Sequence, residues 1–127
     1  MSLPITSVIA GIVALLMVPL SLQISMRRAR VKVAYGDADD RDLRRKIRAH
    51  GNFIEYAPTA LILLALVELT GTSALFVWCL GGLFVLGRVL HAIGMLYTST
   101  PTLQTIAMIM SHTAFLTSGI WLLYRFV

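Results

Sequence analysis

Three polar residues near the middle of the chain, Arg48, Asn52 and Glu55, are spaced to lie together on one face of a helix. Their positions i, i+4 and i+7 follow the helical repeat. Arginine pairs with carboxylates, glutamate accepts hydrogen bonds from ammonium or amide groups, and asparagine both donates and accepts. This polar stripe therefore predicts a pocket for a small zwitterionic ligand.

A second set of polar residues lies close to the stripe or in the next apolar segment, namely His50, Tyr56, Arg88 and His91. Glu55 lies about 10 Å along its helix from Arg48, at 1.5 Å per residue. Arg88 lies about 13 Å before Tyr97. Because these depths agree, we expect an ion pair between Glu55 and Arg88 on adjacent helices. A purely structural pair, with Asn52 bonding between the helices, is the alternative interpretation.

The composition indicates an integral membrane protein. Of the 127 residues, 57% are hydrophobic and 13% are charged, which is too apolar for a soluble domain with a polar surface. The net charge of +5 could suggest a nucleic-acid partner. However, nine of the eleven Lys and Arg residues lie between Arg27 and Arg48, beside hydrophobic segments. A loop that flanks a membrane explains them better, and no nucleic-acid partner is expected.

Four segments are long and apolar enough to span a bilayer as helices. We predict one domain over residues 1–127, with helices at about 3–26, 41–70, 72–97 and 102–125 and a polar loop at 27–40. Asp39 or Asp40 is the expected N-cap of the second helix. The basic loop should be cytoplasmic, with both termini on the other side of the membrane.

Glu55 and Glu68 are too close in sequence to lie on opposite sides of a membrane. About 18 Å of helix separates them, so at least one carboxylate must lie at membrane depth. We place Glu55 at that depth and expect Glu68 at the far end of its helix. The single cysteine, Cys79, excludes an internal disulfide and should be a packed thiol, and His112 should pack within the bundle or bond to a neighbour.

Two short segments resemble the MAPEG family, membrane-associated proteins in eicosanoid and glutathione metabolism. They are Arg-x-x-x-Asn-x-x-Glu-Tyr-x-Pro at residues 48–58 and Gly-Arg-Val-Leu-His at residues 87–91, and the resemblance covers nearly the whole chain. It implies an all-α membrane protein, a left-handed bundle of four transmembrane helices that assembles as a homotrimer. Glutathione would bind between neighbouring subunits near the cytoplasmic face.

The resemblance also implies roles for single residues. Catalysis would involve Arg48, His91 and Gln104. Glutathione, as a cosubstrate, would be contacted by a larger set of residues, with no metal: Arg27, Arg28, Arg48, His50, Asn52, Glu55, Tyr56, Arg88 and His91. Within that set, Arg88 would orient Glu55.

Three positions depart from the family's enzymes. Gln104 replaces an arginine that stabilises the glutathione thiolate in the leukotriene and prostaglandin branches. Met95 replaces a tyrosine of those enzymes, and Gly51 replaces an arginine of some members. Without the first arginine, His91, Arg48 or Arg88 would have to stabilise the thiolate.

The resemblance favours a detoxifying enzyme, a membrane glutathione S-transferase or glutathione-dependent peroxidase that acts on hydrophobic electrophiles or lipid hydroperoxides from the bilayer. The alternative, favoured by Gln104, is a catalytically inactive scaffold that binds glutathione or lipid. A small multidrug transporter is a third candidate, but such proteins carry their key glutamate in the first span, and here that span is uncharged. We expect a multi-pass protein, of the cell inner membrane if the source is bacterial.

Overall fold

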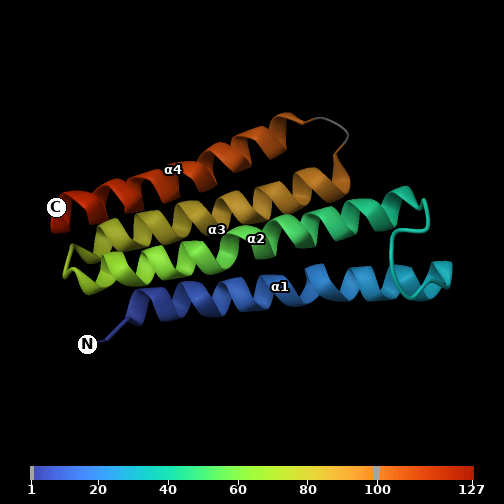
Figure 1. Ribbon diagram of the computed structural model, residues 1–127, viewed down its shortest axis with the longest axis horizontal. Coiled ribbons are helices and arrows are strands. Elements are labelled where there is room, and N and C mark those ends of the chain that lie inside the picture. The colour runs from blue at the N-terminus through green and yellow to red at the C-terminus, as the bar shows by residue number, and fades with distance from the viewer. Residues whose placement is uncertain (1, 99–100) are drawn as a thin grey trace.

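The computed structural model describes residues 2–98 and 101–127, and these form four long helices that run antiparallel in chain order (Figure 1). The helices are α1 (Pro4–Val31), α2 (Arg41–Leu69), α3 (Ala74–Tyr97) and α4 (Thr102–Phe126). Each of them is long and apolar enough to cross a membrane. The predicted all-α membrane protein with four spanning helices is confirmed.

The two central helices of the bundle are α2 and α3. Each of them contacts the other three helices, whereas α1 and α4 lie on opposite sides (Figure 1). The buried apolar residues of α2 recur every three or four positions, at Phe53, Ala57, Ala60, Leu64 and Val67. That spacing directs one face of the helix into the core.

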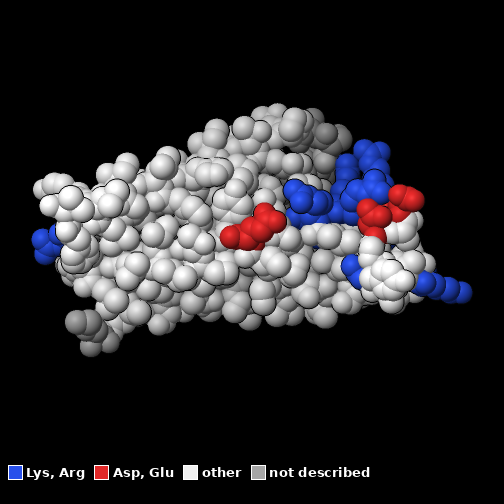
Figure 2. Space-filling model, in the orientation of Figure 1, with Lys and Arg blue, Asp and Glu red and all other residues white. Residues whose placement is uncertain are grey.

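The two ends of the bundle differ in charge. We call the end formed by residues 27–48 the basic end, because Lys and Arg gather there (Figure 2). Both termini lie at the opposite end, together with the turn between α2 and α3 (Figure 1). We call that opposite end the terminal end.

The first helix is longer than predicted. It continues past the expected end at residue 26 to Val31, so the connecting segment is 32–40 instead of 27–40. Arginine is a good helix former, and Arg28 and Arg30 in the last turn interact favourably with the helix dipole. The helix ends at Lys32, which has a left-handed φ of 57° and donates its N–H to the carbonyl of Arg28.

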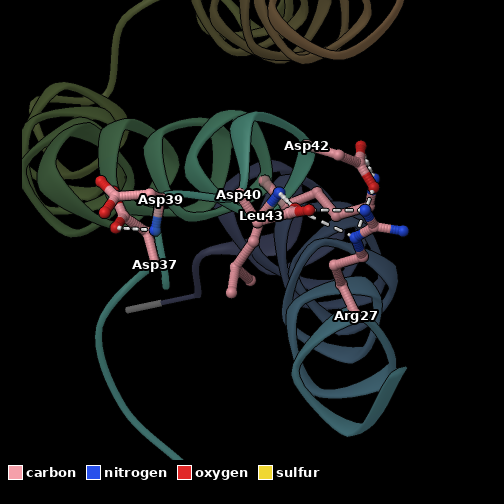
Figure 3. A network of polar contacts seen from close by, with 7 residues as sticks. Arg27, Asp37, Asp39, Asp40, Asp42 and Leu43 are labelled. Carbon is pink, nitrogen blue, oxygen red and sulfur yellow. Dashed lines mark hydrogen bonds and ion pairs between the residues drawn. The ribbon is translucent and has the colours of Figure 1, made fainter. Parts of the chain in front are cut away.

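The predicted N-cap of α2 is confirmed at Asp40. Its Oδ1 accepts the backbone N–H of Leu43 at 2.6 Å and the Nε–H of Arg27 at 3.0 Å (Figure 3). A second oxygen, Oδ2, accepts from Nη2 of Arg27 at 2.6 Å. One carboxylate therefore begins α2 and ties it to the end of α1.

Glu68 lies at the terminal end, as predicted, and holds the start of α1. Its two carboxylate oxygens accept the backbone N–H groups of Ile5 at 2.9 Å and Thr6 at 2.8 Å. These N–H groups have no partner within their own helix. Thr70, two residues later, accepts a hydrogen bond from the Trp121 indole at 3.3 Å, so the end of α2 is bonded to both α1 and α4.

Glycines of α3 let neighbouring helices approach closely. A Cβ at Gly87 would lie 2.9 Å from the Ala107 carbonyl oxygen, and one at Gly94 would lie 3.0 Å from Gln104. Gly82 has open space instead. The expectation for Cys79 was wrong, because its thiol is exposed on the single chain; it lies on an outer face of α3 that no other helix of the bundle covers.

Candidate functional site

The predicted polar stripe of α2 runs between the bundle interior and its outer surface. Arg48 and Glu55 are exposed, whereas Asn52 and Tyr56 are half-buried. Asn52 bonds to α3 through Arg88. Tyr56 packs against α4, with its ring centroid 5.7 Å from that of Phe115. The stripe therefore offers charged groups outward on a base that is fixed to two other helices.

The guanidinium of Arg88 joins three helices inside the bundle. Nη2 donates to Oδ1 of Asn52 on α2, and Nη1 donates to Oγ of Ser111 on α4 at 3.4 Å. The Tyr56 ring covers the group, with its centroid 5.1 Å from Cζ, which is within cation–π range. A buried charge is tolerated where it has such partners. At 1% exposure, Arg88 positions Asn52 and Tyr56 from inside the bundle.

The predicted ion pair between Glu55 and Arg88 is wrong. In the described part of the chain, no ion pair includes Glu55, and its side chain is exposed. At 100° per residue, Glu55 is rotated about 60° around α2 from Asn52. That rotation gives Arg88 the neutral amide oxygen of Asn52 and leaves the carboxylate outside. Glu55 is thus available to a ligand or to another subunit.

A basic pocket of about 460 Å³ lies beside the stripe at the basic end. Its lining residues come from the end of α1, the connecting segment and the start of α2: Arg28, Gly36, Asp37, Arg44, Ile47 and Arg48. Arg44 pairs with Asp37 at 2.5 Å and with Asp39 at 3.2 Å. Among the described residues, Arg28 and Arg48 have no ion-pair partner, so the pocket presents two uncompensated cations.

Arg27 does not line this pocket. It pairs with Asp40 at 2.6 Å and with Asp42 at 3.2 Å (Figure 3). Of the two arginines considered at the end of the first helix, Arg28 is therefore the one that the structure brings next to Arg48. Arg27 instead closes the connection between α1 and α2.

The aspartates of the connecting segment remain ionised through these contacts. Hydrogen bonds from Arg27 and from the Leu43 N–H lower the pKa of Asp40 from 3.8 to about 2. A hydrogen bond from Arg44, with another from the Asp39 N–H, lowers the pKa of Asp37. Both carboxylates are thus negative at any physiological pH, and they hold Arg27 and Arg44 in place.

Of the three predicted catalytic residues, His91 is buried and Gln104 is half-buried. His91 is 4% exposed, and its Nδ1 has no hydrogen-bond partner in residues 2–98 and 101–127. Gln104 donates its side-chain amide to the carbonyl oxygen of Gly94 at 3.2 Å. His50 is half-buried on α2. No group of three metal-binding side chains occurs in the part of the chain that the structure describes.

An apolar groove of about 180 Å³ lies between α1 and α3. Leu16, Pro19 and Leu20 form one side of it, and Ala92 and Leu96 form part of the other. Arg88 and Phe53 also contribute to its lining. A small hydrophobic molecule fits such a groove, which lies on the other side of Arg88 from α4.

Comparison with known proteins agrees with this architecture. The sequence pattern that defines the MAPEG family matches residues 6–124, which include parts of all four helices. The chain belongs to the MAPEG family. It is similar to the inner membrane protein YecN of Escherichia coli K12 and of Escherichia coli O6:H1, each 33% identical over 90 residues. The match covers 71% of this chain and 69% of YecN. The family resemblance seen in the sequence is confirmed.

The three departures from the MAPEG enzymes have different structural settings. Gln104 uses its amide N–H on Gly94 and thereby holds α4 against α3. Met95 packs against the hydrophobic core. Gly51 has open space where a side chain would begin. A larger residue could therefore replace Gly51 without repacking, whereas Gln104 is part of a helix contact.

Two residues of α4 contribute more than the sequence suggested. Ser111, which the motifs did not indicate, is fully buried and bonds to Arg88. His112 lies edge-on to Tyr56, with ring centroids 5.8 Å apart. Adjacent polar residues in an otherwise apolar span were the available signal. His112 is exposed and does not pack inside the bundle, and its Nδ1 contacts the carbonyl oxygen of Met108, one turn earlier in α4 itself.

Proposed function

We propose that this protein is a glutathione S-transferase or glutathione-dependent peroxidase of the membrane, with hydrophobic electrophiles or lipid hydroperoxides as second substrates. Family membership supports this proposal, and one observation carries it. The stripe of α2 presents a cation and an anion, Arg48 and Glu55, that form no ion pair within residues 2–98 and 101–127 and lie at opposite ends of about 10 Å of helix. That length suits an extended tripeptide at roughly 3.5 Å per residue.

The charges of the stripe complement those of glutathione. Arg48 and Arg28 can pair with carboxylates of the peptide, and Glu55 can accept from its ammonium group. Asn52 has its oxygen bonded to Arg88, so its amide N–H groups remain to bind a peptide carbonyl. The apolar groove beside Arg88 could hold a hydrophobic second substrate that arrives through the bilayer.

The proposal includes a homotrimer, as the family resemblance implies. Glu55 is exposed on the single chain, and at the membrane depth that we expect for it a carboxylate that faces lipid costs roughly 2.5 to 3.5 kcal/mol. A neighbouring subunit would cover it and would complete the glutathione site. Sedimentation of the detergent-solubilised protein tests this state, with a monomer as the contrary result.

The proposed location is the bacterial inner membrane, which is where the name of YecN places that relative. The basic end would face the cytoplasm by the positive-inside rule, with both termini on the other side. Reporter fusions after Val127 that are active only outside the cytoplasm test this orientation. Fusions that are inactive at this site would indicate the opposite orientation, with the C-terminus in the cytoplasm.

The deciding experiment measures glutathione binding by calorimetry on wild type, Arg48→Ala and Glu55→Ala, followed by a conjugation assay on the same samples. Binding that is lost in both variants, with turnover by wild type, supports the transferase. Binding without turnover on electrophiles or on lipid hydroperoxides would support the scaffold. The absence of binding in wild type would reject a glutathione function and leave the stripe as a packing feature.

The scaffold is the second candidate because of Gln104. Its amide N–H is bonded to Gly94, and it carries no charge that could stabilise a thiolate. An enzyme of this family with Gln104 needs another group for that task.

A further inference from the structure

We propose that His112 is the general base that deprotonates the bound thiol, which deepens the proposed glutathione function and rests on it. The tautomer of its ring supports this role. Nδ1 of His112 lies 2.8 Å from the carbonyl oxygen of Met108. A carbonyl can only accept, so Nδ1 carries the proton and Nε2 of the neutral ring keeps a free lone pair.

The ring of His112 lies beside the stripe of α2. The ring is exposed and meets Tyr56 edge-on at 5.8 Å between centroids. Tyr56 follows Glu55 directly and lies one helical turn beyond Asn52. The cysteine of a glutathione that lies between Arg48 and Glu55 is thus about one turn from the level of His112.

His112 also lies at the same depth in the bundle as the residues that support the stripe. Its neighbour Ser111 bonds to Arg88 at 3.4 Å, so His112 lies at the level of the guanidinium that fixes Asn52 and Tyr56. An exposed imidazole at membrane depth is costly in lipid, which favours a functional role over a packing role. The MAPEG enzymes with a helix-four arginine need no such base, whereas this chain has Gln104.

The proposed step is balanced without any further reactant. Nε2 of His112 takes the proton of the glutathione S–H, which gives a thiolate and an imidazolium. The sulfur electron pair forms a C–S bond to the β carbon of an alkene conjugated to a carbonyl. The alkene π pair becomes the C=C bond of an enolate, and the carbonyl π pair moves to its oxygen. The imidazolium then returns its proton to the resulting enolate, so the thiol has added across the double bond.

The test uses His112→Asn, which keeps a structural contact and removes the base. The asparagine amide can still donate to the Met108 carbonyl, but it offers no basic nitrogen. We expect the thiolate ultraviolet absorbance of bound glutathione to fall at least about tenfold and kcat/KM with an enone to fall about a hundredfold. The Kd for S-methylglutathione should change less than about threefold. This ligand has no thiol proton, so a residue that acts only as the base contributes nothing to its binding.

The possible failures are distinguishable. A wild type that binds no S-methylglutathione overturns the proposed function and, with it, this role of His112. A variant that forms thiolate and turns over as wild type does overturns the role of His112 alone. Weakened S-methylglutathione binding by His112→Asn, in proportion to the loss of turnover, would make the residue structural and would also overturn the proposal.

Discussion

Glu55 and Glu68 are the two glutamates of the chain, and both lie on α2, but their surroundings differ. The carboxylate of Glu68 accepts two backbone N–H groups at the start of α1. Glu55 is exposed and has no ion pair in the described residues. One glutamate, Glu68, therefore serves as a helix cap at the terminal end, whereas the other, Glu55, remains available for binding near the basic end.

This difference separates stability from recognition within one helix. A group whose hydrogen bonds are satisfied inside the bundle contributes to folding and adds little to ligand binding. A charged group left open at membrane depth lowers the stability of the lone subunit and keeps its capacity for a partner. The following experiments test whether the two glutamates divide these roles as their contacts suggest.

The largest effect is expected from Glu55→Gln on glutathione binding. The amide lacks the negative charge that would pair with the ligand ammonium, so affinity should fall about a hundredfold, or about 2.7 kcal/mol. The melting temperature in detergent should not fall, because Glu55 forms no ion pair in the part of the chain that the structure describes. Calorimetry and thermal unfolding measure the two effects, and a destabilised variant with normal binding would contradict the assignment.

Gly87→Ala should give the next largest effect, through the contact of α3 with α4. The added Cβ would meet the Ala107 carbonyl and Ser111 Oγ, both at 2.9 Å. Relieving that overlap should cost about 2 kcal/mol of unfolding free energy. It should also weaken the bond from Ser111 to Arg88, which supports the site.

Gly82→Ala is the matched control for this substitution. Nothing lies within 4 Å of its Cβ position, and alanine is the better helix former by about 1 kcal/mol. We expect equal or higher stability in chemical denaturation. A similar loss for both glycines would mean that close helix approach is not the cause.

Glu68→Gln should lower stability more modestly, by about 1 kcal/mol. The amide retains one acceptor for the two N–H groups of Ile5 and Thr6 and loses the charge that interacts with the α1 dipole. Glutathione affinity should stay within about twofold, because this end is remote from the stripe. If Glu68→Gln reduced glutathione affinity without reducing stability, the assignment of Glu68 to stability and Glu55 to binding would be contradicted.

The smallest effect is a titration at the basic end. Because the pKa of Asp40 is lowered from 3.8 to about 2, its contribution to stability is complete above pH 3.8 and is lost as the pH falls through about 2. The Leu43 amide proton, which bonds to Asp40, should report this midpoint in NMR spectra. Arg27→Gln should move the midpoint towards 3.8, and a wild-type midpoint already near 3.8 would refute the lowered pKa.

Much of the architecture followed from local sequence signals. The four spanning helices, the N-cap at Asp40 and the family motif of residues 48–58 were all predicted correctly. Each depends on hydropathy or spacing over a few turns of chain. The predicted end of α1 lies five residues before the observed end, because a charged last turn has the composition of a loop.

Hydropathy and helical spacing are enough to predict four spanning helices and to place Arg48, Asn52 and Glu55 along one of them. The packing of the helices is needed to show that Arg88 bonds to Asn52 and Ser111 instead of Glu55, and that Glu68 caps a helix more than sixty residues away. Side-chain pairing between helices depends on how far each helix is rotated about its own axis. Helical periodicity fixes which residues share a face, but a rotation of about 60° changes which of them meets a neighbour, and only the packed bundle sets that angle.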